Sequence, residues 1–239
     1  MTTCRLDTAM VLAAGLGTRF REVSGDLPKP LVKVGGKALI DWTLDLLAKG
    51  DVERAVVNVH YKADAVEAHL ADRHDPEITI SDERDQLMET GGGLIRATPL
   101  LGDGPVFCTN TDAIIEAGSH DPVGALRSVW EDREMDALLL LVPLEQTSGY
   151  QGNGDFVVDH SGRLAWDGEG PRYVFSGLQI IHPRLWADEK AEPKSTRVFW
   201  EKAMASGRLF GLVHDLRWMH VGDRAGFEAA ERHLHPDAP

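Results

Sequence analysis

The sequence predicts an α/β protein with a Rossmann-like, doubly wound sheet that is mostly parallel but mixed and carries a small antiparallel β decoration. Three observations support this. Short apolar runs alternate with segments of helical periodicity up to about residue 143. The run over residues 9–14 is continuously apolar and ends at Gly15, which is typical of a buried parallel strand. Beyond residue 143, glycines and short turn-flanked strands indicate an antiparallel element.

Strands and helices alternate along the first part of the chain. After the strand at 9–14, a polar, glycine-containing loop precedes a helix over 39–49, in which apolar residues recur at helical spacing and Gly50 stands at the C-cap position. The remaining elements of this part are a strand at 55–59, a helix at 63–72, a strand at 78–81, a helix at about 92–97, a strand at 106–110, a helix at 123–130 and a strand at 137–142.

The second part begins with a predicted β-hairpin, in which DFVVD and RLAW flank the turn His160-Ser161-Gly162. It continues with a strand at 174–181, a helix at 197–205, strands at 209–214 and 218–221, and a closing helix at 225–234. No repeat, low-complexity tract or linker divides the chain. We therefore expect a single domain over residues 1–239.

Charge and composition narrow the class of protein. The 239 residues carry 25 Lys plus Arg against 38 Asp plus Glu, and this net charge of −13 disfavours nucleic acid and anionic membranes as partners. Two cysteines are too few for a disulfide framework, and the sequence lacks both a signal peptide and an apolar run of about 18 residues. We expect a soluble, cytoplasmic protein that is a monomer or a small homo-oligomer.

A basic segment follows the first strand. Residues 19–37 contain five basic and two acidic residues: Arg19, Arg21, Lys29, Lys33 and Lys37 against Glu22 and Asp26. Glycines after a strand allow backbone N–H groups to approach an anion closely. The segment is neither a P-loop nor a dinucleotide fingerprint, because GxxxxGK[ST] is missing and Phe20 replaces the third glycine. Taken alone, the glycine pair is compatible with a tight turn or with an anion site.

The spacing of this segment resembles a known signature. Gly15-x-Gly17-Thr18-Arg19, eight residues, then Pro28-Lys29-Pro30-Leu31 is similar to the motif of the sugar-1-phosphate nucleotidylyltransferases. The resemblance implies the nucleotide-diphospho-sugar transferase fold and a bound nucleoside triphosphate. It further implies that Arg19 and Lys29 act in catalysis and that the nucleotide is held by Ala13, Ala14, Gly15, Gly17 and Thr18.

Two further segments resemble this family. Glu89-Thr90-Gly91-Gly92-Gly93 reads either as a flexible loop with a capping threonine or as the ETGGG element of the uridylyltransferases that act on N-acetylmuramate 1-phosphate. That element faces the nucleotide base, which makes Glu89 and Gly92 candidate nucleotide contacts. Asn110 and Asp112 end a strand at the carboxyl edge of the sheet, where Asp112 is either a turn cap or a ligand.

The resemblance assigns a metal ion to Asp112 and leaves its second ligand open. Relatives carry Trp-x-Asp-Val-Gly-Thr near the C-terminus, whereas residues 218–223 here place His220 at the carboxylate position. Imidazole suits softer metals than Mg²⁺. Four interpretations follow: Mg²⁺ is held by Asp112 and phosphates alone, the enzyme prefers Mn²⁺, Asp223 helps to bind the metal, or His220 has no role at the site. We favour the first and keep His220 as a metal candidate.

The acceptor site is predicted from shorter similarities. FSG at 175–177 resembles the family element beside the sugar phosphate, although Ser176-Gly177 alone is also compatible with a bulge. GNGD at 152–155 resembles the family's Gly-Arg-Gly-Asp with asparagine for arginine. Lys194 is placed to meet an anionic group of the acceptor, or is simply solvated. The substrate-binding candidates are therefore Asp155, Ser176, Gly177 and Lys194.

The resemblance implies a reaction in which a sugar 1-phosphate attacks the α-phosphorus of a nucleoside triphosphate and releases pyrophosphate. Residues 1–143 would bind the nucleotide and 144–239 the sugar phosphate. UTP with N-acetylmuramate 1-phosphate is the first choice, followed by mannose 1-phosphate with GTP, glucose 1-phosphate with dTTP or UTP, and phosphocholine with CTP. A non-catalytic nucleotide-sugar-binding module also stays open because of His220. A glycosyltransferase is disfavoured, because Asn110 stands where an Asp-x-Asp pair would begin.

Overall fold

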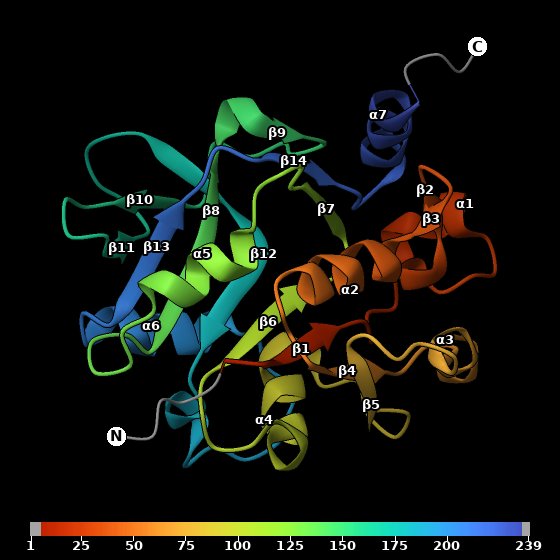
Figure 1. The fold of residues 1–239 in the computed structure, drawn as a ribbon, viewed down its shortest axis with the longest axis horizontal. Coiled ribbons are helices and arrows are strands. Elements are labelled where there is room, and N and C mark those ends of the chain that lie inside the picture. Colours follow the sequence, from red (N-terminus) through yellow and green to blue (C-terminus); the bar gives the residue numbers. More distant parts are fainter. Residues whose placement is uncertain (1–5, 236–239) are drawn as a thin grey trace.

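A mixed β-sheet forms the centre of the molecule (Figure 1). The computed structural model describes residues 6–235. Within that range the main sheet has nine strands in the order β11-β10-β12-β6-β1-β4-β5, with β8 on the other side of β12 and β13 beyond β8. These strands are β1 (Thr8–Leu12), β4 (Arg54–Val59), β5 (Glu77–Asp82), β6 (Val106–Asn110), β8 (Ala137–Pro143), β10 (Phe156–Val158), β11 (Leu164–Ala165), β12 (Arg172–Ile181) and β13 (Leu209–Val213).

The strand pairings divide the sheet into two parallel groups and an antiparallel part. Strand β1 runs parallel to both β4 and β6, β4 runs parallel to β5, and β13 runs parallel to β8. Strand β12 is antiparallel to both β6 and β8, so it joins the two parallel groups. The antiparallel pair β10–β11 extends from the early part of β12. This arrangement confirms the predicted mostly parallel, mixed sheet with a small antiparallel decoration.

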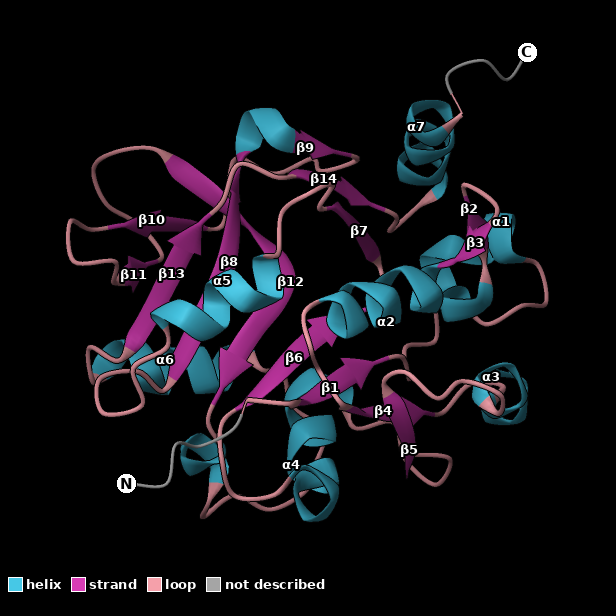
Figure 2. Cartoon of the chain, viewed as in Figure 1, coloured by secondary structure: helices cyan, strands magenta, loops and turns pink. Residues whose placement is uncertain are grey.

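Helices cover both faces of the sheet (Figure 2). The helices are α1 (Arg21–Ser24), α2 (Leu39–Lys49), α3 (Ala63–Leu70), α4 (Glu89–Leu101), α5 (Pro122–Val129), α6 (Arg197–Ala205) and α7 (Arg224–Leu234). Apolar side chains of α2, α3 and α5 pack in one core layer, and those of α4 and α6 pack in the other. The sheet is therefore buried on both sides, which explains why its strands are almost continuously apolar.

Two small sheets surround the end of the molecule near α7. The hairpin of β2 (Lys33–Val34) and β3 (Lys37–Ala38) is one, and β7 (Ala113–Glu116), β14 (Arg217–His220) and β9 (Thr147–Ser148) form the other. Short 3₁₀ turns are η1 (Thr18–Phe20), η2 (Lys29–Leu31), η3 (Leu144–Gln146) and η4 (Pro183–Trp186). A third apolar cluster joins α2, β14 and α7 here. Because β7 follows β6 directly, this cluster supports the segment that carries Asp112.

Some local predictions were wrong. Residues 89–91 were expected to be loop, yet α4 begins at Glu89, so the glycines lie within its first turns. The segments forming α1, the β2–β3 hairpin, β7 and β9 were expected to be loop or went unassigned, because each is too short to show periodicity. A register irregularity between Phe175 and Gln179 shows that β12 does contain a bulge around Ser176-Gly177. Among residues 6–235, no helix is long and apolar enough to cross a lipid bilayer.

Candidate active site

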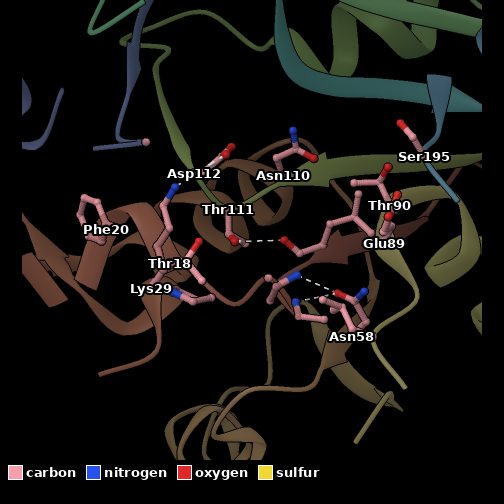
Figure 3. Close-up of a pocket in the computed structure, with 18 residues that line it drawn as sticks. Thr18, Phe20, Lys29, Asn58, Glu89, Thr90, Asn110, Thr111, Asp112 and Ser195 are labelled. Atoms are coloured by element: carbon pink, nitrogen blue, oxygen red, sulfur yellow. Dashed lines mark hydrogen bonds and ion pairs between the residues drawn. The ribbon is translucent and has the colours of Figure 1, made fainter. Parts of the chain in front are cut away.

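A cavity of about 470 Å³ opens at the carboxyl ends of β1 and β6 (Figure 3). This is the edge at which ligands bind in open α/β sheets. Residues from six regions of the chain line it: Leu12, Ala13, Ala14, Gly15, Gly17, Thr18, Phe20, Lys29, Pro30, Asn58, Leu87, Glu89, Thr90, Asn110, Thr111, Asp112, Ser195 and Gly222. Of the predicted site residues, the structure brings together Ala13, Ala14, Gly15, Gly17, Thr18, Lys29, Glu89, Asn110 and Asp112.

The glycine loop leaves β1 and turns sharply into η1. Asn58 at the end of β4 holds its beginning, because the Oδ1 atom of Asn58 accepts hydrogen bonds from the amides of Ala13 at 2.7 Å and Ala14 at 3.2 Å. Gly17 has a φ of 57°, and a Cβ atom there would lie 3.1 Å from the Cβ of Lys29. A side chain at this position would be both strained and crowded. The side chain of Arg19 lies outside the described part of the structure.

Lys29, Asp112 and His220 meet on one side of the cavity. The Nζ atom of Lys29 lies 3.7 Å and the Nε2 atom of His220 lies 3.8 Å from Oδ2 of Asp112. The Lys29 side chain is only 14% exposed, whereas that of Asp112 is 42% exposed. Surrounding atoms alone would raise the pKa of Asp112, but His220 and the Lys29 ammonium outweigh this effect and lower the pKa to about 2. Asp112 is therefore an anion near neutral pH.

The ring of His220 packs against two neighbours. It stacks on the indole of Trp218, with centroids 5.7 Å apart and planes inclined by 2°. A Cβ atom at Gly222 would lie 2.2 Å from Cε1 of the ring, so any other residue there would displace the ring. His220 itself is not part of the cavity lining, but its orientation toward Asp112 is fixed by packing.

The donor set fits a hard divalent cation only when phosphate oxygens complete it. Mg²⁺ in nucleotide sites is commonly bound through one or two carboxylates plus phosphates, and Asp112 places one carboxylate in the cavity lining. Asp223 instead caps α7, accepting a hydrogen bond from the Gly226 amide at 2.9 Å. Across residues 6–235, no three His, Cys, Asp or Glu side chains form a metal-binding group. The interpretation that needs only Asp112 and phosphates stays a prediction.

The opposite wall is the start of α4 (Figure 3). Glu89 has a φ of 59°, an uncommon conformation for a residue with a side chain, and both Glu89 and Thr90 line the cavity. The amides of Gly91 and Gly92 donate to the carbonyl of Lys194 at 2.8 and 3.0 Å. A Cβ atom at Gly92 would lie 2.4 Å from the carbonyl oxygen of Glu192. The close backbone approach expected at Gly92 is thus made by the chain's own segment 192–195, and Gly92 does not line the cavity.

The four acceptor candidates lie outside the lining. Asp155 accepts hydrogen bonds from the Tyr150 hydroxyl and the Phe175 amide, both at 2.8 Å. Ser176 is buried, and Gly177 packs beside Asn110. The ammonium of Lys194 lies 2.5 Å from Glu189 and 3.1 Å from Glu192, and these carboxylates raise its pKa. The structure therefore gathers most of the nucleotide candidates, Gly92 excepted, but not these four.

Sequence reasoning missed several residues of the site. Asn58 and Ser195 belong to segments that were interpreted only as a strand and as the approach to a helix. Phe20 lies beneath Lys29, whose Nζ atom is 5.3 Å from the ring centroid. Behind the lining, the buried Glu83 side chain accepts a hydrogen bond from Asn58 at 2.8 Å. The one available signal was a polar Asn58 inside the apolar run AVVNV, which is unusual in a strand buried on both faces.

A known structure shares this architecture. The inositol-1-phosphate CTP transferase from T. maritima superposes with a TM-score of 0.74 over 98% of both chains, at 19% identity, which shows the shared fold. The Nucleotidyl transferase family model matches residues 8–163.

Two curated relatives extend the match along the chain. An N-acetylmuramate alpha-1-phosphate uridylyltransferase from Caulobacter vibrioides is 45% identical over 95% of this chain and 96% of its own. An enzyme of the same name from Neisseria meningitidis is 31% identical over 90% of this chain and 92% of its own. The chain therefore belongs to the nucleotidyl transferase family and is an enzyme of that class. This result confirms the family predicted from the glycine loop and the Pro-Lys-Pro segment. Nucleotidyltransferases of this family generally use a divalent metal ion.

Proposed function

We propose that this enzyme transfers a uridylyl group from UTP to N-acetylmuramate 1-phosphate, giving UDP-N-acetylmuramate and pyrophosphate. The observation that carries the proposal is the 45% identity to the N-acetylmuramate alpha-1-phosphate uridylyltransferase from Caulobacter vibrioides over almost the full length of both chains. The cavity supports it, because the glycine loop, Lys29 and Asp112 converge there as nucleotidyl transfer requires.

The chemistry needs positioned charge rather than a protein nucleophile. A phosphate oxygen of the sugar 1-phosphate attacks the α-phosphorus of UTP, a new P–O bond forms, and the bond to the β-phosphate oxygen breaks to release pyrophosphate. Lys29, oriented by its contact with Asp112, neutralises charge that develops on the phosphates. Arg19 has the same role in this proposal. The loop from Ala13 to Thr18 binds the nucleotide in this proposal. Because Asn58 accepts from the amides of Ala13 and Ala14, the amides from Gly15 onward are the ones proposed to meet the phosphates.

The proposal includes a metal ion. Asp112 would hold Mg²⁺ together with phosphate oxygens, and His220 would adjust the position of the Asp112 carboxylate. When bound, Mg²⁺ supplies Lewis-acid stabilisation of the phosphate charge. Mn²⁺ remains the alternative ion because of the imidazole. Residues 1–143 contribute nearly all of the lining, which agrees with their proposed role as the nucleotide-binding part, while 144–239 would bind the sugar phosphate.

The acceptor contacts and the cellular setting extend the same proposal. Asp155, Ser176, Gly177 and Lys194 stay predictions for the sugar phosphate. Gly177 packs beside Asn110, and Lys194 directly precedes Ser195; both Asn110 and Ser195 line the cavity. A monomer or small homo-oligomer in the cytoplasm, where nucleoside triphosphates are available, is the expected form. An activated muramate sugar suggests a role in the recycling of peptidoglycan.

The experiment is a grid of pyrophosphate release. Purified enzyme with Mg²⁺ is given UTP, CTP, GTP or dTTP against N-acetylmuramate 1-phosphate, N-acetylglucosamine 1-phosphate, glucose 1-phosphate, mannose 1-phosphate and phosphocholine. Turnover with UTP and N-acetylmuramate 1-phosphate alone supports the proposal. Another productive pair would retain the chemistry and replace the substrates. No turnover with any pair, in Mg²⁺ or Mn²⁺, would favour the non-catalytic nucleotide-sugar-binding module.

A further inference from the structure

Glu83 is a buried carboxyl group that neither the cavity nor the proposed reaction uses. It follows β5 and is 0% exposed. Fully buried glutamates are rare unless they are paired. Burial raises the pKa of Glu83, whereas hydrogen bonds from Asn58 and Met88 oppose that rise. Its backbone is fixed, because its amide donates to the Val59 carbonyl at 2.8 Å and its carbonyl lies 2.6 Å from Nδ1 of His60.

The two oxygens of Glu83 connect opposite walls of the cavity. Oε1 accepts a hydrogen bond from Nδ2 of Asn58 at 2.8 Å, and Oε2 accepts one from the amide of Met88 at 3.1 Å. Asn58 in turn accepts from the amides of Ala13 and Ala14. Met88 immediately precedes Glu89 and Thr90. One carboxyl group therefore links the beginning of the glycine loop to the start of α4.

This network also fixes which way the Asn58 carboxamide faces. A carboxylate only accepts hydrogen bonds, so Glu83 selects the Nδ2 side of Asn58 and leaves Oδ1 for the two loop amides. The pair is covered by α4, because a Cβ atom at Gly93 would lie 2.9 Å from Oε1 of Glu83 and 3.0 Å from Nδ2 of Asn58. A side chain at position 93 would therefore push the helix away from this pair.

We propose that Glu83 is a positioning residue for the nucleotide: it orients Asn58 and anchors Met88, and so sets the relative placement of the glycine loop and the start of α4. This inference rests on the proposed function, in which the cavity binds UTP. Loss of the network should weaken nucleotide binding and raise the KM for UTP, while the KM for the sugar phosphate changes little.

The test exchanges the two side-chain types. In Glu83→Gln, the new carboxamide has one oxygen for two donors, the Asn58 carboxamide and the Met88 amide. In Asn58→Asp, the introduced carboxyl group faces the carboxyl group of Glu83. The double variant Asn58→Asp/Glu83→Gln again gives every hydrogen-bond donor in the network an acceptor. The carboxylate introduced at position 58 accepts from both loop amides and from the carboxamide introduced at position 83, whose oxygen accepts from Met88. We expect each single change to weaken UTP binding about 10-fold, which corresponds to about 1.4 kcal/mol, and the double variant to restore it.

Binding of UTP with Mg²⁺ is measured by titration calorimetry without acceptor, beside the melting temperature and the KM of both substrates. Asp85→Asn, which removes an exposed charge two residues away, is the matched control and should bind UTP normally. Wild-type affinity in Glu83→Gln, or no recovery in the double variant, would overturn the inference. If Glu83→Gln does not fold, the comparison of Asn58→Asp with the double variant decides. Failure of the wild type to bind UTP would overturn the proposed function and this inference together.

Discussion

Substituting Gly92 by alanine should destabilise the protein by forcing α4 away from the segment that packs on it. The new Cβ atom would lie 2.4 Å from the carbonyl oxygen of Glu192, and the two backbones must separate by about 1 Å to reach an ordinary contact of 3.4 Å. That displacement stretches the hydrogen bonds from Gly91 and Gly92 to the Lys194 carbonyl. Ser195, which lines the cavity, moves with them.

The size of the effect follows from three contributions. Two weakened hydrogen bonds cost about 2 kcal/mol, and strain from the extra atom adds about 1–3 kcal/mol. Alanine recovers about 1 kcal/mol, because it favours the helix over glycine. The net loss is about 3 kcal/mol, which for a chain of this size lowers the melting temperature by roughly 6–12 °C.

Thermal unfolding of Gly92→Ala is compared with that of Gly15→Ala. A Cβ atom at Gly15 meets nothing within 4 Å, so this control should melt within about 2 °C of wild type. An equal melting temperature for Gly92→Ala and wild type would refute the reasoning, because it would show that segment 192–195 moves without loss of stability.

Three further predictions concern individual side chains. Asp112→Asn should abolish pyrophosphate release while the melting temperature stays near that of wild type; retained turnover would contradict the metal role proposed for this carboxylate. His220→Asp, by adding a second carboxylate, should raise the ratio of Mg²⁺- to Mn²⁺-supported activity, and an unchanged ratio would show that His220 does not influence the choice of metal. Burial raises the pKa of the Cys108 thiol to about 12. In a Cys4→Ser background the folded protein should therefore not react with a thiol reagent at pH 8, and should react only after unfolding in urea. Reaction of one thiol per folded chain would contradict the burial of Cys108.

The central features of the site were predictable because they are encoded locally. The glycine loop and Lys29 lie within one segment of some twenty residues, and Asp112 follows a strand with a clear apolar pattern. Continuous apolar runs likewise predicted the strands of the parallel sheet, since both of its faces are covered.

The rest depends on contacts between distant segments. The bonds from Asn58 to the loop span 45 and 44 residues, and that between Thr90 and Thr196 spans 106. Periodicity carries no information about such pairs. The start of α4 was misplaced for the same reason: three consecutive glycines have a low helix propensity, and the Lys194 carbonyl, remote in sequence, accepts from two of their amides.

The position of β12 has a consequence for the order of folding. Strands β6 and β8 both precede it in the chain and pair with it on opposite sides, so neither has that partner until residues 172–181 have been synthesised. Strand β8 also lacks its other partner, β13, which is synthesised later still. During translation the emerging chain therefore presents uncovered edges on both β6 and β8, which are open to pairing with other chains. Fragments that end before Arg172 should aggregate, and chaperone binding to nascent chains should peak shortly before β12 leaves the ribosome.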